Sequence, residues 1–270
     1  MRPTATVAIA LTCTLAFAPG PATAGDTATS EQGIINGEAI GTDEFPSAGQ
    51  LIFTGTIALG NWELPATMPL CTATPITPDA LLSAAHRVEE FFLHYGAGTL
   101  IDPLFCVSFD EDLSWMAEQS YQGNPPLPDD AVCGSHWVQH PDWDVQEMMN
   151  FQGEGLANFH DLSLVFLGEV VEDRPFDYLP DEDEAGQLVE QMEVDIVGYG
   201  QRTPEPMDPW NPDPDAAYKR YWAHTFINEL GEHEMQIGGD VSTGRKCHGD
   251  SGGPTYVDVE TDLSVARRVI

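Results

Sequence analysis

Basic residues are scarce in this 270-residue chain: ten Lys and Arg stand against 44 Asp and Glu, for a formal net charge of −34. Lysine occurs only at Lys219 and Lys246. A chain this negative is repelled by the phosphates of nucleic acids and of anionic membranes, so we expect neither as a partner. Hydrophobic residues still make up 42% of the chain, enough for a packed core, which excludes a wholly disordered acidic protein.

Apolar runs long enough to cross a membrane are also missing, since a spanning helix needs about 20 residues. The apolar run at residues 7–18 follows Arg2 and precedes Ala22-Thr23-Ala24, a small-residue cleavage site. Pro19-Gly20-Pro21 would break a helix that continued into the body of the protein. Residues 1–24 are therefore predicted to be a signal peptide. The rest is predicted to be secreted, with no membrane attachment, and a periplasmic location stays open.

Cysteine is scarce as well. Cys13 belongs to the predicted signal, which leaves four cysteines: Cys71, Cys106, Cys133 and Cys247. In an oxidising compartment four cysteines can pair in three ways. They include no C-x-x-C element, so a structural zinc site is not expected.

Short apolar or alternating runs, separated by 25 glycines and 21 prolines, dominate the rest of the chain. They fit strands of ordinary length. The runs are 50–59, 162–167, 189–197, 219–227 and 254–259, and the last turns at 260–262 back onto 264–270. Helices are expected only at 84–92 and 113–120. Many short strands at regular spacing favour an all-β barrel or sandwich.

Two stretches are low in apolar residues. Residues 172–184 carry seven acids and are predicted to form a solvated loop. A carboxylate-rich loop could hold calcium, but this one shows no recognisable ligand spacing, and no other cofactor is expected. Residues 204–215 hold five prolines and cannot form a central strand.

Residues 247–254 read Cys-His-Gly-Asp-Ser-Gly-Gly-Pro. The glycines around Ser251 allow a tight turn that exposes its hydroxyl. The amides of Gly249 and Ser251 can then point to one spot, where they would hold the negative charge that develops on an attacked carbonyl. A serine hydroxyl needs a base to become a nucleophile. Without one, the string would be only a glycine-rich turn.

Two further strings offer that base and its partner. Residues 81–86 run from an apolar strand end through small residues into His86, and Asp161 stands at the start of a buried strand. A histidine can take the proton of Ser251, and an aspartate can hold the imidazole in the correct tautomer. Taken singly, His86 would be a core histidine and Asp161 a strand cap. Together with Ser251 they predict nucleophilic catalysis.

On these motifs, the chain from Ile34 to Ile270 resembles the trypsin- and chymotrypsin-like serine proteases. The resemblance rests on S-A-A-H ending at His86, H-D-L-S-L-V from His160, G-D-S-G-G-P around Ser251, and the supporting strings Ile34-Ile35-Asn36-Gly37, Phe45-Pro46 and Gly198-Tyr199-Gly200. It implies a monomeric endopeptidase that acts on proteins or peptides. The implied fold is two six-stranded antiparallel β-barrels with the active site between them.

The resemblance also assigns roles. It makes His86 the general base, Asp161 the acid that orients it, and Ser251 the nucleophile. The amides of Gly249 and Ser251 would form the oxyanion hole. Arg245, six residues before Ser251, would lie at the floor of the specificity pocket, where it would favour a substrate Asp or Glu unless it turns away to pair with another carboxylate.

A zymogen is implied too. Cleavage before Ile34 would free an amino group that pairs with Asp250 and orders the oxyanion loop. Residues 25–33 would then be a short propeptide and 34–270 the protease domain. Gly33 stands where trypsin-like zymogens carry Arg or Lys, so activation by a trypsin is not expected.

Two departures from the family matter. The chain stops shortly after Ser251, before the strands that wall the specificity pocket. We therefore expect a fragment with an incomplete second barrel, and a catalytically inactive, protease-like binding protein is the alternative. Arg87 stands where the family has a cysteine that pairs with one like Cys71. The preferred bridge is Cys106–Cys133, because both cysteines flank the long segment between His86 and Asp161, which includes a predicted surface insertion at 148–157.

Overall fold

The computed structural model describes residues 34–41, 43–59, 61–87, 99–116, 119, 124–151, 156, 159–172, 174–201, 218–240, 242–261 and 264–270. The predicted signal peptide, the predicted propeptide and the proline-rich residues 204–215 lie outside the described residues. The predicted helices at 84–92 and 113–120 and the predicted insertion at 148–157 are described only in part.

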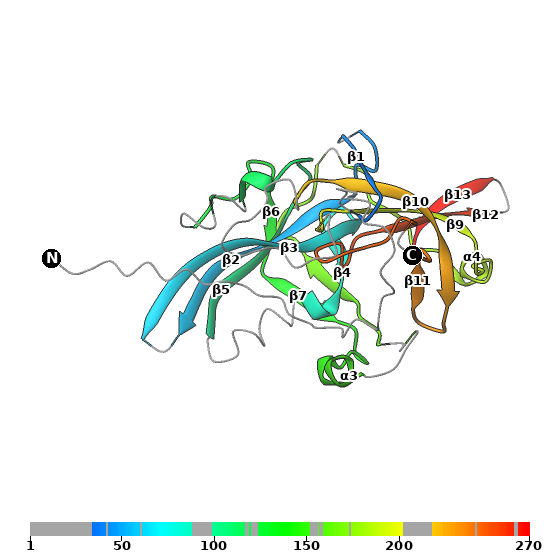
Figure 1. Ribbon diagram of the computed structural model, residues 1–270. Coiled ribbons are helices and arrows are strands. Elements are labelled where there is room, and N and C mark those ends of the chain that lie inside the picture. The colour runs from blue at the N-terminus through cyan, green and yellow to red at the C-terminus, as the bar shows by residue number, and fades with distance from the viewer. Residues whose placement is uncertain are drawn as a thin grey trace, which may run out of the picture.

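Two antiparallel sheets make up most of the described chain, which confirms the all-β prediction (Figure 1). The first sheet has seven strands in the order β6-β5-β2-β3-β4-β8-β7. Its strands are β2 Gly49–Leu59, β3 Trp62–Thr77, β4 Ala80–Ser83, β5 Thr99–Ser108, β6 Val132–Gly134, β7 His136–Gln139 and β8 Ser163–Phe166. The outermost strands, β6 and β7, are consecutive in the chain and separated only by Ser135. The two edges of this sheet are thereby joined into a nearly closed barrel.

The second sheet has six strands, in the order β1-β10-β9-β12-β13, with β11 also paired to β10. Its strands are β1 Glu38–Ala39, β9 Glu193–Gly198, β10 Tyr221–Leu230, β11 Met235–Ile237, β12 Thr255–Glu260 and β13 Val265–Val269. In the described chain β13 and β1 remain separate edges, so this sheet is a half-barrel. The expectation of two regular six-stranded barrels is therefore not met. One sheet has a seventh strand, and the other does not close.

A long three-stranded ribbon extends from the first sheet, where β2, β3 and β5 curve away from the other strands (Figure 1). Strand β3 pairs with β4 only from Thr74 onward, which leaves its outer part as a sheet edge. Pro65 and Pro69 lie in that outer part, and Pro103 lies in β5. Proline lacks an amide donor and protects an edge strand against further pairing. The sequence analysis predicts neither β3 nor β5, and both strands contain proline, which counts against a strand.

Each sheet has its own apolar core. The core of the first sheet contains five fully buried side chains: Leu51, Phe53, Leu81, Phe105 and Val165. The second core is built from four buried aliphatic side chains: Val194, Ile227, Val257 and Val259. A further cluster, in which Ala48 packs with Tyr256 and Val269, joins the start of the first sheet to the second. Leu51 and Phe53 in the first core, and Val257 and Val259 in the second, follow the two-residue period of a strand.

The described helices are short. Helix α3, Val145–Asn150, is capped by Asp144, and α4, Glu182–Ala185, begins with a capping box formed by Asp181 and Glu184. Residues 172 and 174–181 lie outside helices and strands, as predicted for the loop at 172–184, and only its end belongs to α4. Glu184 is buried and accepts two 2.7 Å hydrogen bonds from Arg268 of β13. Its carboxylate is therefore paired with an arginine within the fold.

Candidate active site

Strand pairing brings His86 and Asp161 together. β4 and β8 run antiparallel, and Ser83 at the end of β4 faces Ser163 at the start of β8. His86 follows β4 by three residues and Asp161 precedes β8 by two, so both lie at the same end of this strand pair. His86 Nδ1 lies 2.5 Å from Asp161 Oδ2, and the His86 backbone amide donates to Asp161 Oδ1 at 2.7 Å.

This double contact fixes the tautomer of the imidazole. A carboxylate oxygen that accepts from the ring requires a proton on His86 Nδ1, and in the neutral imidazole Nε2 is then an acceptor. The second bond, to the backbone amide, prevents the carboxylate from rotating away. The side chains of His86 and Asp161 are 15% and 27% exposed, so water reaches the pair only in part. An imidazole held in this way by a carboxylate can act as a general base.

The turn that carries Ser251 packs against β3 and against the end of β4. The Thr72 amide donates to the Ser251 carbonyl at 3.1 Å, and Thr72 Oγ1 donates to the Gly249 carbonyl at 3.0 Å. Gly252 has a φ of +74°, and a side chain there would collide with Ser83 Oγ and the Ala84 amide, two residues before His86. The serine turn therefore depends on a glycine at 252. Within the described residues the Ser251 hydroxyl makes no hydrogen bond to His86.

The predicted oxyanion amides are free to bind a ligand. Gly249 has a φ of +95°, a left-handed conformation that other residues rarely adopt. The turn is closed by the Asp250 amide donating to the Cys247 carbonyl and the Gly253 amide donating to the Asp250 carbonyl. Across the described part of the chain, neither the Gly249 amide nor the Ser251 amide donates to a protein acceptor. Two donors beside the Ser251 hydroxyl thus remain available to a carbonyl oxygen.

Asp250 is fully buried beneath this turn. Its Oδ1 accepts from the Gly200 amide at 2.7 Å and its Oδ2 from the Cys247 amide at 2.8 Å. Burial raises the pKa of Asp250 to about 6, opposed by these two hydrogen bonds and then by the positive charges of Lys246 and Arg87.

The predicted partner of Asp250, Ile34, is also buried, but in an apolar cluster with Ile196 and Tyr221. The next residue, Ile35, accepts a 3.2 Å hydrogen bond at its carbonyl from the Arg245 amide. In the intact chain the Ile34 nitrogen belongs to a peptide bond and carries no charge. The predicted ion pair between Ile34 and Asp250 is therefore absent from this form, and it stays a prediction for a cleaved one.

The Arg245 side chain lies against Gly238, where its Cγ is 2.7 Å from the position a Cβ would take. Its Nε is buried, and among the described residues it has no hydrogen-bond partner. Arg245 also makes no ion pair within 4 Å with any carboxylate that the structure describes. After the hydrogen bonds from Ser242, the charge of Arg245 also lowers the pKa of Asp240, so both predictions for Arg245 stay predictions.

Three histidines that sequence reasoning did not single out stack beside Asp161. The rings of His140 and His160 have centroids 4.8 Å apart and lie within 11° of parallel, and those of His160 and His233 are 4.3 Å apart. His140 follows β7 of the first sheet, and His233 lies between β10 and β11 of the second. Only the fold brings them together, so no sequence spacing could have revealed the stack.

Of the four cysteines in the described chain, two form a disulfide and two carry thiols. Cys106 and Cys133 form a disulfide, which confirms the preferred pairing. Cys71 and Cys247 form no disulfide in the described chain. Burial raises the pKa of Cys71 to about 11, and burial also raises that of Cys247, so both remain protonated and weakly nucleophilic at neutral pH.

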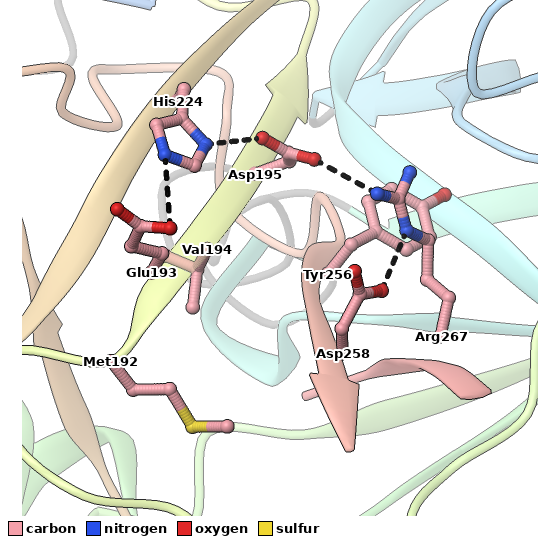
Figure 2. A pocket seen from close by; sticks show the side chains of 8 residues that line it. All are labelled: Met192, Glu193, Val194, Asp195, His224, Tyr256, Asp258 and Arg267. Atoms are coloured by element: carbon pink, nitrogen blue, oxygen red, sulfur yellow. Dashed lines mark hydrogen bonds and ion pairs between the residues drawn. The ribbon is translucent and has the colours of Figure 1, made fainter. Parts of the chain in front are cut away.

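A separate hollow of about 350 Å³ lies on the second sheet and contains none of the predicted catalytic residues. Figure 2 shows Asp195 there between His224 and Arg267, with His224 Nδ1 2.9 Å from Asp195 Oδ1. Arg267 also lies 3.2 Å from Asp258 (Figure 2). The charges of this hollow are thus paired with one another, and it offers no nucleophile.

In the described residues no group of three or more His, Cys, Asp or Glu side chains is placed to hold a metal ion. None of the described helices is long and apolar enough to cross a membrane. No protein-family model matches the chain, and no curated protein matches it.

Proposed function

We propose that this protein is a secreted serine endopeptidase of the trypsin-like kind. The observation that carries the proposal is the double contact of Asp161 with His86, placed where the Ser251 turn packs against the end of β4. An open imidazole nitrogen, a serine on a glycine-rich turn and two unused amides then belong to one site. The nearly closed first barrel and the half-barrel are consistent with a two-barrel protease fold.

Each step follows from this arrangement. His86 Nε2 takes the proton of the Ser251 hydroxyl while Oγ attacks the peptide carbonyl, and Asp161 stabilises the resulting imidazolium. The Gly249 and Ser251 amides hold the oxyanion, where losing one such donor costs about 2.7–4 kcal/mol. His86 then gives its proton to the leaving nitrogen as the C–N bond breaks, and water hydrolyses the acyl-enzyme.

In a resting site the bond between nucleophile and base is often long, and it tightens when substrate binds. The absent bond between Ser251 and His86 is therefore compatible with catalysis. It equally suits the second candidate, a protease-like protein that binds partners through its cleft without cleaving them. The contact between His86 and Asp161 favours the enzyme.

A fluorophosphonate probe distinguishes the two candidates, because it reacts only with an activated serine. We expect one label per folded chain, located by peptide mass spectrometry at Ser251. The Ser251→Ala variant is the control and should take up none. A folded wild-type chain that stays unlabelled, both intact and cut before Ile34, would support the binding protein instead.

Arg245 sets the specificity that we propose for this enzyme. A guanidinium binds carboxylates with paired, charge-assisted hydrogen bonds. Arg245 makes no ion pair with a described carboxylate, so its charge is available to a substrate. Cleavage of a peptide library is expected after Asp or Glu, and Arg245→Gln should abolish that preference. Preferred cleavage after Arg, Lys or large apolar residues would contradict this assignment.

A further inference from the structure

The carboxylate of Asp250 is fully buried in the intact chain. A buried carboxylate is costly unless a positive charge or several donors compensate it. Two backbone amides bind the two oxygens of Asp250, but amides carry no net charge. The Ile34 nitrogen supplies none either while it remains in a peptide bond. Any positive charge that compensates Asp250 in this form must therefore come from a side chain.

Lys246 lies on the same turn. It is one of only two lysines in the chain, and its Nζ donates a 2.5 Å hydrogen bond to the Gly253 carbonyl. The Gly253 amide in turn donates to the Asp250 carbonyl at 2.9 Å. The lysine side chain thus spans the turn from residue 246 to residue 253, across the segment that holds the oxyanion amides and Ser251.

The electrostatics of the two groups agree with this geometry. Burial lowers the pKa of Lys246 to about 8, and the charge of Asp250 opposes that shift. In the opposite direction, the positive charge of Lys246 lowers the pKa that burial raises at Asp250. Arg87, after β4, is the other cation that acts on Asp250. Lys246 is hydrogen-bonded to the turn itself, through the Gly253 carbonyl and not through the Asp250 carboxylate.

We propose that Lys246 is a positioning residue that compensates Asp250 and closes the 246–253 turn in the uncleaved chain. The oxyanion amides of Gly249 and Ser251 are then in place without cleavage before Ile34. This inference rests on the proposed protease function and concerns its regulation. It also explains why Gly33 can stand where trypsin-like zymogens carry Arg or Lys. A chain that is active without cleavage before Ile34 needs no basic residue at position 33.

The inference predicts a pH dependence. Asp250 is ionised above about pH 6 and Lys246 is charged below about pH 8, so both charges are present between these values. Above about pH 8 Lys246 loses its proton and its positive charge. Only Arg87 and the two backbone amides then compensate the charge of Asp250. Reactivity of Ser251 in the intact chain should therefore fall as the pH rises through about 8.

The test measures the rate of fluorophosphonate labelling of the full, uncut chain. Lys246→Met should lower that rate at least tenfold at pH 7, while Lys246→Arg should keep it, since an arginine can carry the same charge. Because arginine stays charged to above pH 12, Lys246→Arg should also shift the loss of reactivity to higher pH. Lys219→Met is the matched control: Lys219 lies 3.4 Å from Asp112 at the surface, and its loss should leave the rate unchanged.

A second arm uses the full chain with residues 31–33 replaced by a specific cleavage site, so that it can be cut directly before Ile34. The new amino group should restore labelling to Lys246→Met. Equal labelling of intact wild type and intact Lys246→Met would overturn the inference while the protease function stands. So would an intact wild type that reacts only after the cut. If neither form of the wild type reacts, the protease function itself is wrong. Should Lys246→Met fail to fold, the pH profile of Lys246→Arg decides.

Discussion

Asp161→Asn is expected to lower kcat by about 10⁴-fold, with KM and the free energy of unfolding little changed. The carboxamide keeps an oxygen for the His86 backbone amide, so the turn after β4 stays in place. Its NH₂ group would face His86 Nδ1, which must then become an acceptor. The proton moves to Nε2, and the base can no longer accept from Ser251. Steady-state kinetics with a peptide substrate, alongside a urea unfolding curve, measures both effects.

The chain contains its own control for this substitution. Asp195 and His224 form a second aspartate–histidine contact, 2.9 Å long, on the surface of the second sheet (Figure 2). Asp195→Asn makes the same chemical change away from the serine turn and should leave kcat within a factor of two. A loss of less than tenfold in Asp161→Asn, or an equal loss in Asp195→Asn, would show that Asp161 is a structural residue only.

Asp177→Ala is expected to lower the free energy of unfolding by at least about 3 kcal/mol, because it removes a charged acceptor shared by several buried donors. Asp177 Oδ2 accepts hydrogen bonds from Ser47 at 2.7 Å, Thr74 at 3.0 Å and Tyr256 at 2.8 Å. Burial, and then the charge of Asp177, hold the pKa of Tyr256 well above its ordinary value, so its hydroxyl remains a donor. The variant leaves all three hydroxyls without this acceptor.

This network joins the two halves of the molecule. Thr74 belongs to β3 of the first sheet and Tyr256 to β12 of the second, so Asp177→Ala should also reduce catalysis through looser docking of the sheets. Asp258→Ala provides the comparison, since Asp258 lies on the same strand as Tyr256 but pairs with Arg267 at the surface, where such pairs contribute about 0–1 kcal/mol. Equal midpoints of urea unfolding in the two variants would show that the network contributes no more than a surface ion pair.

Residues 172–184 show a limit of predicting solvent exposure from a local run of acidic residues. Seven acids in thirteen residues predicted a solvated loop, because like charges repel and favour water. The structure instead uses Asp177 as the acceptor of a network between the sheets and Glu184 as the buried partner of Arg268. Their partners lie between 79 and 130 residues away for Asp177, and 84 residues away for Glu184. Local composition contains no information about such distant partners.

The fold class followed from the sequence for a physical reason. The alternation of apolar and polar residues has the period of a strand, and it is a local property. The same holds for the glycines around Ser251, whose conformational freedom is set by their own chemistry. Strands β3 and β5 contain prolines, and the effect of a proline depends on whether the strand is central or at an edge.

From the sequence alone came the all-β class and the choice of His86, Asp161 and Ser251 as candidate residues. Which groups actually touch was decided by tertiary structure: the contact between His86 and Asp161, the histidine stack, and the Lys246 side chain across the serine turn. Contacts of this kind depend on strand register and on which edges close, and these are fixed only when distant segments pack together and bury their shared apolar faces.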